Sequence, residues 1–274
     1  MDVLAALADS PDARTSVELA KSCGISTSTC ALVLAELEER SWVTRREDRR
    51  YTLGSGLFGL VYGLRAQFPL LDRGRDALNF LHVTLGAGCS MSKIGATHLT
   101  TVDAVGHGTD GAHAVGQRFP IGPPFGLVAM AWRDDAAIDG WLRRVTPRLT
   151  DADISAHRQV LAEIRDRGYG AWRFDAAHTS LHDRLAAVLA SLEPTTQVTR
   201  ELNTLMTIVT LQSVTGVLEN DLASTEFVVL PIFGRDGQPE YQIEIHLGGR
   251  DELALSELDA TLRHAQALLS TRVA

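Results

Sequence analysis

The sequence predicts an α+β protein in two parts, a small helical head that ends in a hairpin and a larger domain that mixes strands and helices. The head, residues 1–54, is predicted from helical segments followed by two short β-type segments. The larger part, residues 70–274, is predicted from strand-type alternation and helix-type periodicity that recur along it. An amphipathic segment at residues 55–69 joins the two. With 274 residues, the chain is long enough for both domains.

The composition is that of an ordinary globular protein. Hydrophobic residues make up 45% of the chain, so a core can form without disulfides or metal. The cysteines Cys23, Cys30 and Cys89 are scattered and lack metal-ligand spacing, which favours a reducing compartment. No apolar run approaches the roughly 18–20 residues of a membrane span, and the first residues do not resemble a signal peptide. We therefore expect a cytoplasmic protein with no cofactor and no membrane partner.

Residues 16–40 follow the pattern of two helices joined by a tight turn. The first helix is expected over residues 16–23, and Gly24 supplies the positive φ that a tight helix exit needs. Ser26 is expected to cap the second helix, residues 27–40, because its hydroxyl can accept a bond from a free amide of the first turn. Apolar residues recur at the spacing of a buried face: Ile25, Cys30, Val33, Leu34 and Leu37.

Two short strands are predicted directly after these helices, over residues 42–46 and 49–53, around an acidic turn. Two helices followed by such a hairpin are typical of a winged helix-turn-helix. This unit places its second helix in the major groove of DNA and its hairpin on the neighbouring phosphates. The candidate DNA-binding residues are the hydroxyl-bearing start of the second helix and the arginines of the hairpin: Ser26, Thr27, Ser28, Thr29, Arg45, Arg46, Arg49 and Arg50.

Basic residues are concentrated at the hairpin. The formal net charge of the chain is −8, and residues 1–54 hold seven Lys and Arg against nine Asp and Glu. Five of those seven basic residues fall within residues 40–50. A focused patch can hold phosphates while the acidic remainder suppresses loose binding. A merely solvated charged hairpin is the alternative interpretation.

The start of the second helix carries no Arg, Lys, Asn or Gln, the side chains that make bidentate contacts with bases. Methyl contacts to thymine from Thr27 or Ala31, together with shape reading by the hairpin arginines, are the expected substitutes. We expect an affinity that depends steeply on salt, and a specificity set largely by a dimer spacing of about 34 Å.

A connecting helix is predicted after the head, because Leu57, Leu60, Val61 and Leu64 recur at helical spacing before Pro69. Its apolar stripe must be buried against a partner subunit or against the second domain of the same chain, and the pattern leaves both open.

The second domain is expected to begin with a helix over residues 70–85 and to continue with strands and helices in mixed order. A capping box at Thr150 opens one long helix, which Gly168 ends. Residues 175–225 are interpreted as an insertion packed on this domain. The remaining expected elements are strands at 89–94 and 99–105, a short helix from Pro124, a helix at 134–144, a hairpin of 227–233 and 240–247, and a last helix capped by Ser256.

Several motifs, in this order, resemble IclR-type transcriptional regulators. In the head they are residues 16–20, 24–29, Trp42-Val43 and 51–54. In the second domain, Arg118, Phe119 and Pro120 resemble the opening of a helix in the family's effector domain. Residues 164–169 resemble its "IRERGY" segment, and residues 229–233 with Asp236-Gly237 resemble its "APVFD-DG" strand and turn. The resemblance covers most of the chain, with a gap near 175–225.

The resemblance implies a GAF-like effector-binding domain over residues 70–274 and a homodimer or homotetramer in which the connecting helix contacts the partner subunit. It also implies a ligand between the sheet and the helix after Pro120. Residues 121–132 are apolar and bulky, which favours a hydrophobic or aromatic acid held by free amides at the helix start, with Phe125, Met130 and Trp132 as walls. Plain core packing is the alternative. The candidate effector-binding residues are Ser90, Ser92, Phe125, Gly126, Met130 and His246.

Two other motifs are candidate sites of chemistry. Residues 106–111 match G-x-G-x-x-G, but no helical pattern follows, so we expect a loop rather than a nucleotide site. His178 and His182 stand four apart and suit a metal, although the catalytic glutamate of H-E-x-x-H is missing. We therefore expect no enzyme. The predicted function is effector-modulated regulation of transcription, a repressor being the expected type. The alternatives are a DNA-binding regulator whose second domain only oligomerises, and, more remotely, a metal-dependent enzyme using His178 and His182.

Overall fold

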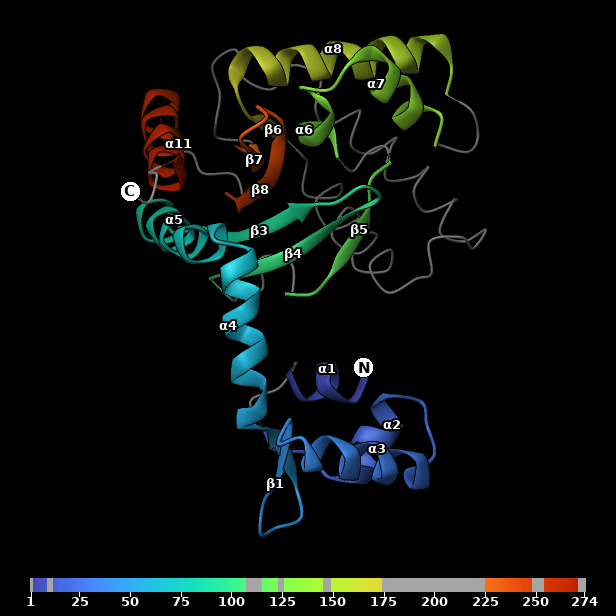
Figure 1. Ribbon diagram of the computed structural model, residues 1–274. Coiled ribbons are helices and arrows are strands. Elements are labelled where there is room, and N and C mark those ends of the chain that lie inside the picture. Colours follow the sequence, from blue (N-terminus) through green and yellow to red (C-terminus); the bar gives the residue numbers. More distant parts are fainter. Residues whose placement is uncertain are drawn as a thin grey trace. The chain divides into compact units, whose positions relative to one another are not determined.

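The computed structural model describes residues 2–8, 12–106, 115–122, 126–144, 149–173, 225–247 and 254–270. The chain forms two compact units, Met1–Pro69 and Leu70–Ala274 (Figure 1). Phe125, His178, His182 and nearly all of the proposed insertion lie outside the described residues.

The N-terminal unit is a winged helix-turn-helix, as the sequence predicts. Its helices are α1 (Asp2–Ala8), α2 (Ser16–Ser22) and α3 (Thr27–Glu39), and its hairpin is β1 (Val43–Arg45) with β2 (Tyr51–Leu53). Arg14 forms an isolated bridge with Tyr51, which ties the segment before α2 to the hairpin. The three helices and the hairpin share one small core: Val3, Leu7, Leu19, Ala20, Cys30, Leu34 and Val43.

Local signals fix the helix-turn-helix. Thr15 and Glu18 form a capping box at the start of α2. Gly24 has a φ of 64°, a left-handed conformation that suits glycine in the tight turn. Ser26 caps α3, because its Oγ accepts a hydrogen bond from the amide of Thr29 at 3.0 Å. The caps hold the ends of both helices, so the turn between them is well defined.

The connecting helix α4 (Phe58–Gln67) follows a short 3-10 turn, Ser55–Leu57. The amide of Gly56 donates to the carbonyl of Ser41 at 2.7 Å, and a Cβ at Gly56 would collide with this backbone. Glycine is therefore needed where α4 leaves the head. No residue of α4 is buried, and its exposed large apolar side chains are Phe58, Leu60, Val61, Tyr62 and Leu64.

The second unit contains an antiparallel six-stranded sheet in the order β5-β4-β3-β8-β7-β6. Strands β3 and β8, which come from opposite ends of the unit's sequence, pair at its centre. The strands are β3 (Gly88–Ile94), β4 (His98–Val105), β5 (Arg118–Pro120), β6 (Gly170–Arg173), β7 (Thr225–Phe233) and β8 (Pro239–His246).

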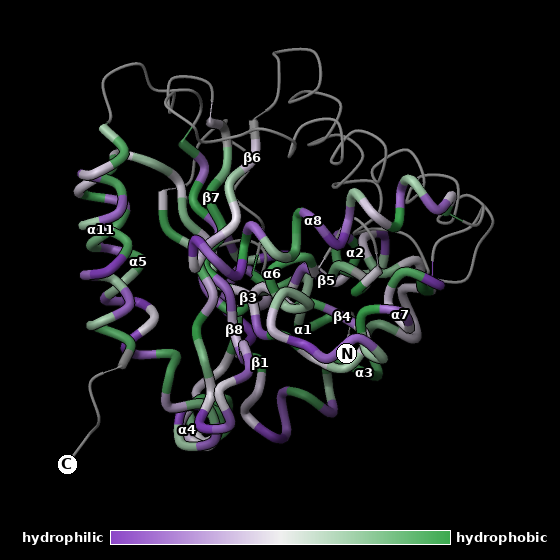
Figure 2. The backbone as a smooth tube through the Cα atoms, turned by 90° about the horizontal axis from the view of Figure 1, so that it is seen from above, coloured by the Kyte–Doolittle hydropathy of each residue, from purple (hydrophilic) through white to green (hydrophobic). Residues whose placement is uncertain are grey.

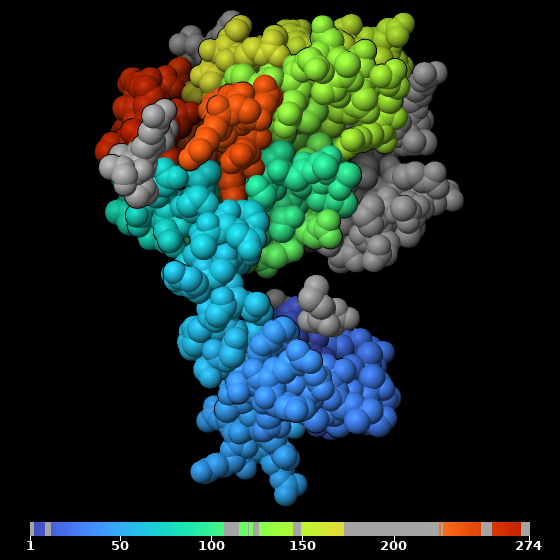
Figure 3. Space-filling view, viewed as in Figure 1, coloured from blue at the N-terminus to red at the C-terminus, as the bar shows by residue number. Residues whose placement is uncertain are grey.

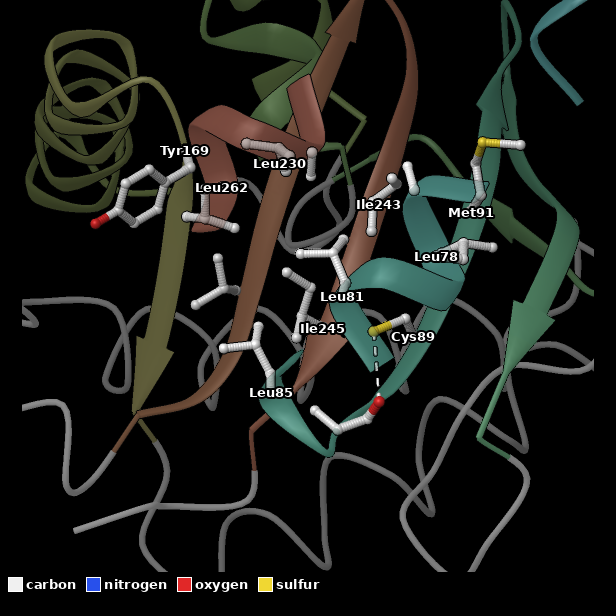
Figure 4. Close-up of a cluster of buried hydrophobic side chains, with 14 of the residues drawn as sticks. Leu78, Leu81, Leu85, Cys89, Met91, Tyr169, Leu230, Ile243, Ile245 and Leu262 are labelled. Carbon is white, nitrogen blue, oxygen red and sulfur yellow. Dashed lines mark hydrogen bonds between the residues drawn. The ribbon is translucent and has the colours of Figure 1, made fainter. Parts of the chain in front are cut away.

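Helices cover both faces of this sheet (Figure 2). On one face lie α5 (Leu70–Leu85) and α11 (Leu255–Ser270); on the other lie α6 (Leu127–Met130), α7 (Asp135–Leu142) and α8 (Asp151–Arg167). Figure 4 shows the first layer, in which Leu78 and Leu81 pack beside Met91, Ile243 and Ile245. Alternate residues of the same strands therefore point to the layer of α6, α7 and α8. Within the described residues, no helix combines the length and hydropathy that a membrane span requires.

Two expectations for this unit were wrong. Arg118–Pro120 is an edge strand rather than the opening of a helix, since it pairs with residues 98–100 of β4 and buries Phe119. Proline is tolerated there because an edge strand does not need every amide for pairing. Ser256 does not cap the last helix, which already begins at Leu255. The amides of Glu257 and Leu258 instead donate to the carbonyl of Ala254.

Candidate nucleic-acid interface and candidate ligand site

Helix α3 has one buried face and one exposed face. Cys30 and Leu34 are fully buried in the core of the head. The exposed face is uncharged over its first two turns and a half, and Glu36 is the first ionisable side chain after Cys30. Leu32 is the most prominent member, with 74% of its surface exposed. The exposed residues of this stretch are Thr27, Ser28, Thr29, Ala31, Leu32 and Ala35.

The predicted hydroxyl-bearing residues lie together at the start of α3. Ser26 Oγ lies 2.8 Å from Ser28 Oγ and 2.8 Å from Thr29 Oγ1. All four residues from Ser26 to Thr29 are exposed. Because free amides and the positive end of the helix dipole are also found at a helix start, this end suits a phosphate oxygen.

Three of the four predicted arginines are exposed on the hairpin, which projects from the N-terminal unit (Figure 3). The guanidinium of Arg45 lies 5.9 Å from the ring centre of Tyr51, and Arg46 Nε lies 4.0 Å from Asp48 Oδ1. Arg49 has a φ of 62°, and its backbone amide closes the turn by donating a hydrogen bond to the carbonyl of Arg46. Residues 45–49 therefore carry three exposed guanidinium groups.

Arg50 differs from the other arginines. Its Nη1 donates to the carbonyl of Ala13 at 2.9 Å and lies 3.5 Å from Glu18 Oε2. The pKa of Glu18 is lowered, chiefly by hydrogen bonds from the amide and hydroxyl of Thr15 and further by the charge of Arg50. The structure therefore gives Arg50 an intramolecular contact, and Arg45, Arg46 and Arg49 remain the better candidates for phosphate contacts.

Charge is distributed unevenly along α3. Glu36 forms an ion pair with Arg40 at 2.7 Å, and Glu38 and Glu39 are exposed at the same C-terminal end. Acidic side chains disfavour phosphates at this end of the helix. The first turns of α3 contain no acidic residue, and in the hairpin the arginines outnumber the acidic residues. The N-terminal half of α3 is thus the half that suits DNA.

A row of polar side chains crosses the sheet of the second unit on the face opposite α5 and α11. Ser90 stands opposite Glu244 in the register of β3 and β8, and Ser92 stands opposite Gln242. On β4, Thr101 stands opposite Ser92, with 3.4 Å between the two hydroxyl oxygens. Directly opposite residues share a face. The polar row is therefore Ser90, Ser92, Thr101, Gln242, Glu244 and His246, all buried or half-buried.

Toward the end of β8, the polar row combines an acid, an imidazole and an unsatisfied hydroxyl. His246 Nε2 lies 3.5 Å from Glu244 Oε1, and the His246 ring packs edge-on against Phe227. Ser90 Oγ is buried without a hydrogen-bond partner among the described residues. A buried polar group that lacks a partner costs about 1–3 kcal/mol. This part of the sheet is therefore suited to a hydrogen-bonding ligand.

Apolar side chains surround the polar row. Helix α6 packs on β7 and β8 and contributes buried Leu127 and Val128, and Ala131, the residue that follows the helix, is buried as well. The predicted residues Gly126 and Met130 lie at the two ends of this helix, Gly126 buried with a φ of 90° and Met130 half-buried. From the sheet, the apolar neighbours are Trp172, Phe227 and Val229.

Sequence reasoning placed some of these residues well and missed others. Ser90, Ser92 and His246 do share one sheet face. Trp132 packs against the same apolar cluster, and its ring contacts Phe233, at the opposite end of β7 from Phe227. Gln242, Glu244 and Thr101 were not among the expected ligand residues. The alternation along β8 was the signal that could have found the first two, because it puts them on the same face as His246.

Among the residues that the structure describes, no three His, Cys, Asp or Glu side chains are grouped as a metal site requires. The two histidines of the metal hypothesis, His178 and His182, are outside those residues.

Comparison with known proteins shows that the architecture of the chain is a known one. Residues 1–50 match the family model described as the MarR family. The whole chain is similar to the IclR of Thermotoga maritima, with 17% identity, a TM-score of 0.58, and 98% of this chain and 94% of that chain covered. Pseudomonas aeruginosa HmgR gives 18% identity, a TM-score of 0.59, and coverage of 97% and 95%. None of the curated proteins matches the sequence.

A third similar structure contains a bound small molecule. It is an IclR homolog from Microbacterium hydrocarbonoxydans, complexed with 4-hydroxybenzoate, at 15% identity and a TM-score of 0.58. The similarity covers 98% of this chain and 96% of that chain. The shared feature that these comparisons show is the fold over nearly the full length.

Proposed function

We propose that this chain, which has the fold of IclR-type transcriptional regulators, binds operator DNA through its N-terminal unit and responds to a small molecule bound in its second unit. The observation that carries the proposal is that one unit combines an exposed, uncharged N-terminal half of α3 with exposed arginines on its hairpin. The MarR-family match over residues 1–50 supports the same function for the head.

In the proposed complex, α3 enters the major groove with its first turns against the base edges. Arg45, Arg46 and Arg49 contact the phosphates beside the groove. Two heads of a homodimer then bind half-sites about one helical turn, or 34 Å, apart. The acidic remainder of the chain limits binding at other surfaces.

The test is selection of duplexes from a random-sequence library by the full-length protein. We expect enrichment of a pair of half-sites with a fixed spacing. If no sequence is enriched even at low salt, where phosphate contacts are strongest, the proposed function is wrong.

The effector that the second unit favours is a hydroxylated aromatic acid. The residues around the polar row are apolar, which favours an aromatic ring, and the polar row offers acceptors in Glu244 and His246 at 3.5 Å from each other. A ligand hydroxyl can donate to Glu244, whereas a ligand carboxylate is repelled there and belongs at the other end of the molecule. The 4-hydroxybenzoate complex of the Microbacterium protein is consistent with this class of ligand.

Hydroxyl recognition by Glu244 leads to a measurable preference. We expect 4-hydroxybenzoate to raise the melting temperature of the protein more than benzoate does at equal concentration. A hydrogen bond to a charged group is worth about 1.5–3 kcal/mol, or about tenfold or more in affinity. In Glu244→Gln this preference should largely disappear.

Glu240→Gln is the matched control, since Glu240 is exposed on the same strand. It should keep the preference for the hydroxylated acid. Equal shifts with both acids in the unchanged protein would contradict the role of Glu244. No stabilisation by any hydroxylated aromatic acid would contradict the ligand class.

A further inference from the structure

The exposed face of α3 offers DNA an apolar surface. Leu32 is 74% exposed. Ala31 directly precedes it, and Ala35 follows it by three residues, about one helical turn; both are exposed. Ser28 completes the face one turn earlier. These side chains contain no charged group and no amide, so none of them can make a bidentate hydrogen bond to a base.

The edges of the bases limit what such a face can recognise. In the major groove each base pair presents hydrogen-bond donors and acceptors, and the C5-methyl of thymine is the apolar feature. The hydroxyls at the start of α3 are within 2.8 Å of one another and can make single hydrogen bonds. An apolar side chain in the groove is therefore stabilised where it meets a thymine methyl and is not stabilised elsewhere.

We propose that Leu32 is a specificity-determining residue that reads the C5-methyl group of thymine, with Ala31 and Ala35 lining the same contact. This inference rests on the proposed DNA-binding function and identifies what the head recognises. The half-site is then marked by thymine at the positions under the centre of α3, rather than by guanine.

A single exposed leucine is common on protein surfaces and by itself indicates nothing. Leu32 differs because of its surroundings. It is a large, exposed apolar side chain in the N-terminal half of α3, and this half contains no acidic residue. In addition, Arg45, Arg46 and Arg49 give the head exposed positive charges that attract a polyanion. The charge complementarity identifies duplex DNA as the occupant of this face.

The test removes the methyl and nothing else. A duplex selected by the full-length protein is prepared with each thymine of the half-site replaced, one at a time, by deoxyuridine, and affinity is measured by fluorescence anisotropy. We expect at least one replacement in each half-site to weaken binding about fourfold, the effect of about 0.8 kcal/mol for one buried methyl-sized group.

The same series is then measured with Leu32→Ala. In this variant the critical deoxyuridine replacement should have almost no further effect, because the side chain that contacts the methyl is missing. Val83→Ala is the matched control: Val83 is 81% exposed on α5 in the second unit and should leave the fourfold effect unchanged.

Each outcome is decisive. If no duplex is selected, the proposed function fails and this inference fails with it. If duplexes are selected but every deoxyuridine replacement is neutral, DNA binding stands and methyl recognition is wrong. If the fourfold effect persists in Leu32→Ala, another residue reads the methyl and the assignment of Leu32 is overturned.

Discussion

Replacing Arg45, Arg46 and Arg49 together by glutamine is expected to weaken DNA binding by about a hundredfold per head at about 0.15 M salt. The reason is counterion release: each neutralised phosphate contributes about 0.9 to the slope of log affinity against log salt. The variant should therefore also show a slope reduced by about 2.7 per head, measured by anisotropy over a salt titration. The loss should be similar for specific and non-specific duplexes, because phosphate contacts carry no sequence information.

Arg235→Gln is the matched control for this experiment, because Arg235 is an exposed arginine in a turn of the second unit. It should leave both affinity and slope unchanged. A triple variant that binds DNA with an unaltered salt slope would show that the hairpin is only a solvated charged surface.

Replacing Leu60 and Leu64 by aspartate is expected to convert an oligomer to a monomer. Both side chains are at least half exposed, at 55% and 50%, and α4 has no buried residue to hold it within the chain. An apolar helix face of this kind is stabilised by a partner, and charges within such an interface are costly. Mass measurement by light scattering should give the size of a single chain.

The same variant should bind a duplex with two half-sites about a hundredfold more weakly, because the two heads are no longer linked. Val83→Asp, on an exposed position of α5, is the control and should remain oligomeric. If the α4 variant keeps its oligomeric state but loses thermal stability, α4 packs on the second domain of its own chain, the other possibility that the pattern allows.

The head could be predicted from sequence because its signals are local. Gly24 and Ser26 mark the turn and the cap within a few residues of the atoms they serve. The contact of Arg50 with Ala13 could not be predicted in this way, because it joins segments that only the folded head brings together. Residue type alone does not distinguish an arginine that is free to contact phosphate from one that is hydrogen-bonded within the protein.

In the second unit, too, the local patterns could be predicted from the sequence, whereas the pairing of distant segments could not. Alternation on β8 assigns its residues to two faces, but the register that sets Ser90 against Glu244 is a property of the sheet. Strand β5 was misassigned for a related reason. Its three residues carry little periodicity, and the pairing of Phe119 with Leu99 determines its conformation.

The central claim, that the first turns of α3 lie against DNA, is tested most directly by the affinity of Ser28→Glu for a selected duplex. A carboxylate in the first turn of a helix favours the helix dipole, so the head should fold with unchanged or higher thermal stability. In the groove the same carboxylate meets acceptors and phosphates, and we expect a loss of at least about a hundredfold in affinity. A Ser28→Glu protein that binds the duplex as tightly as the unchanged chain would contradict the account.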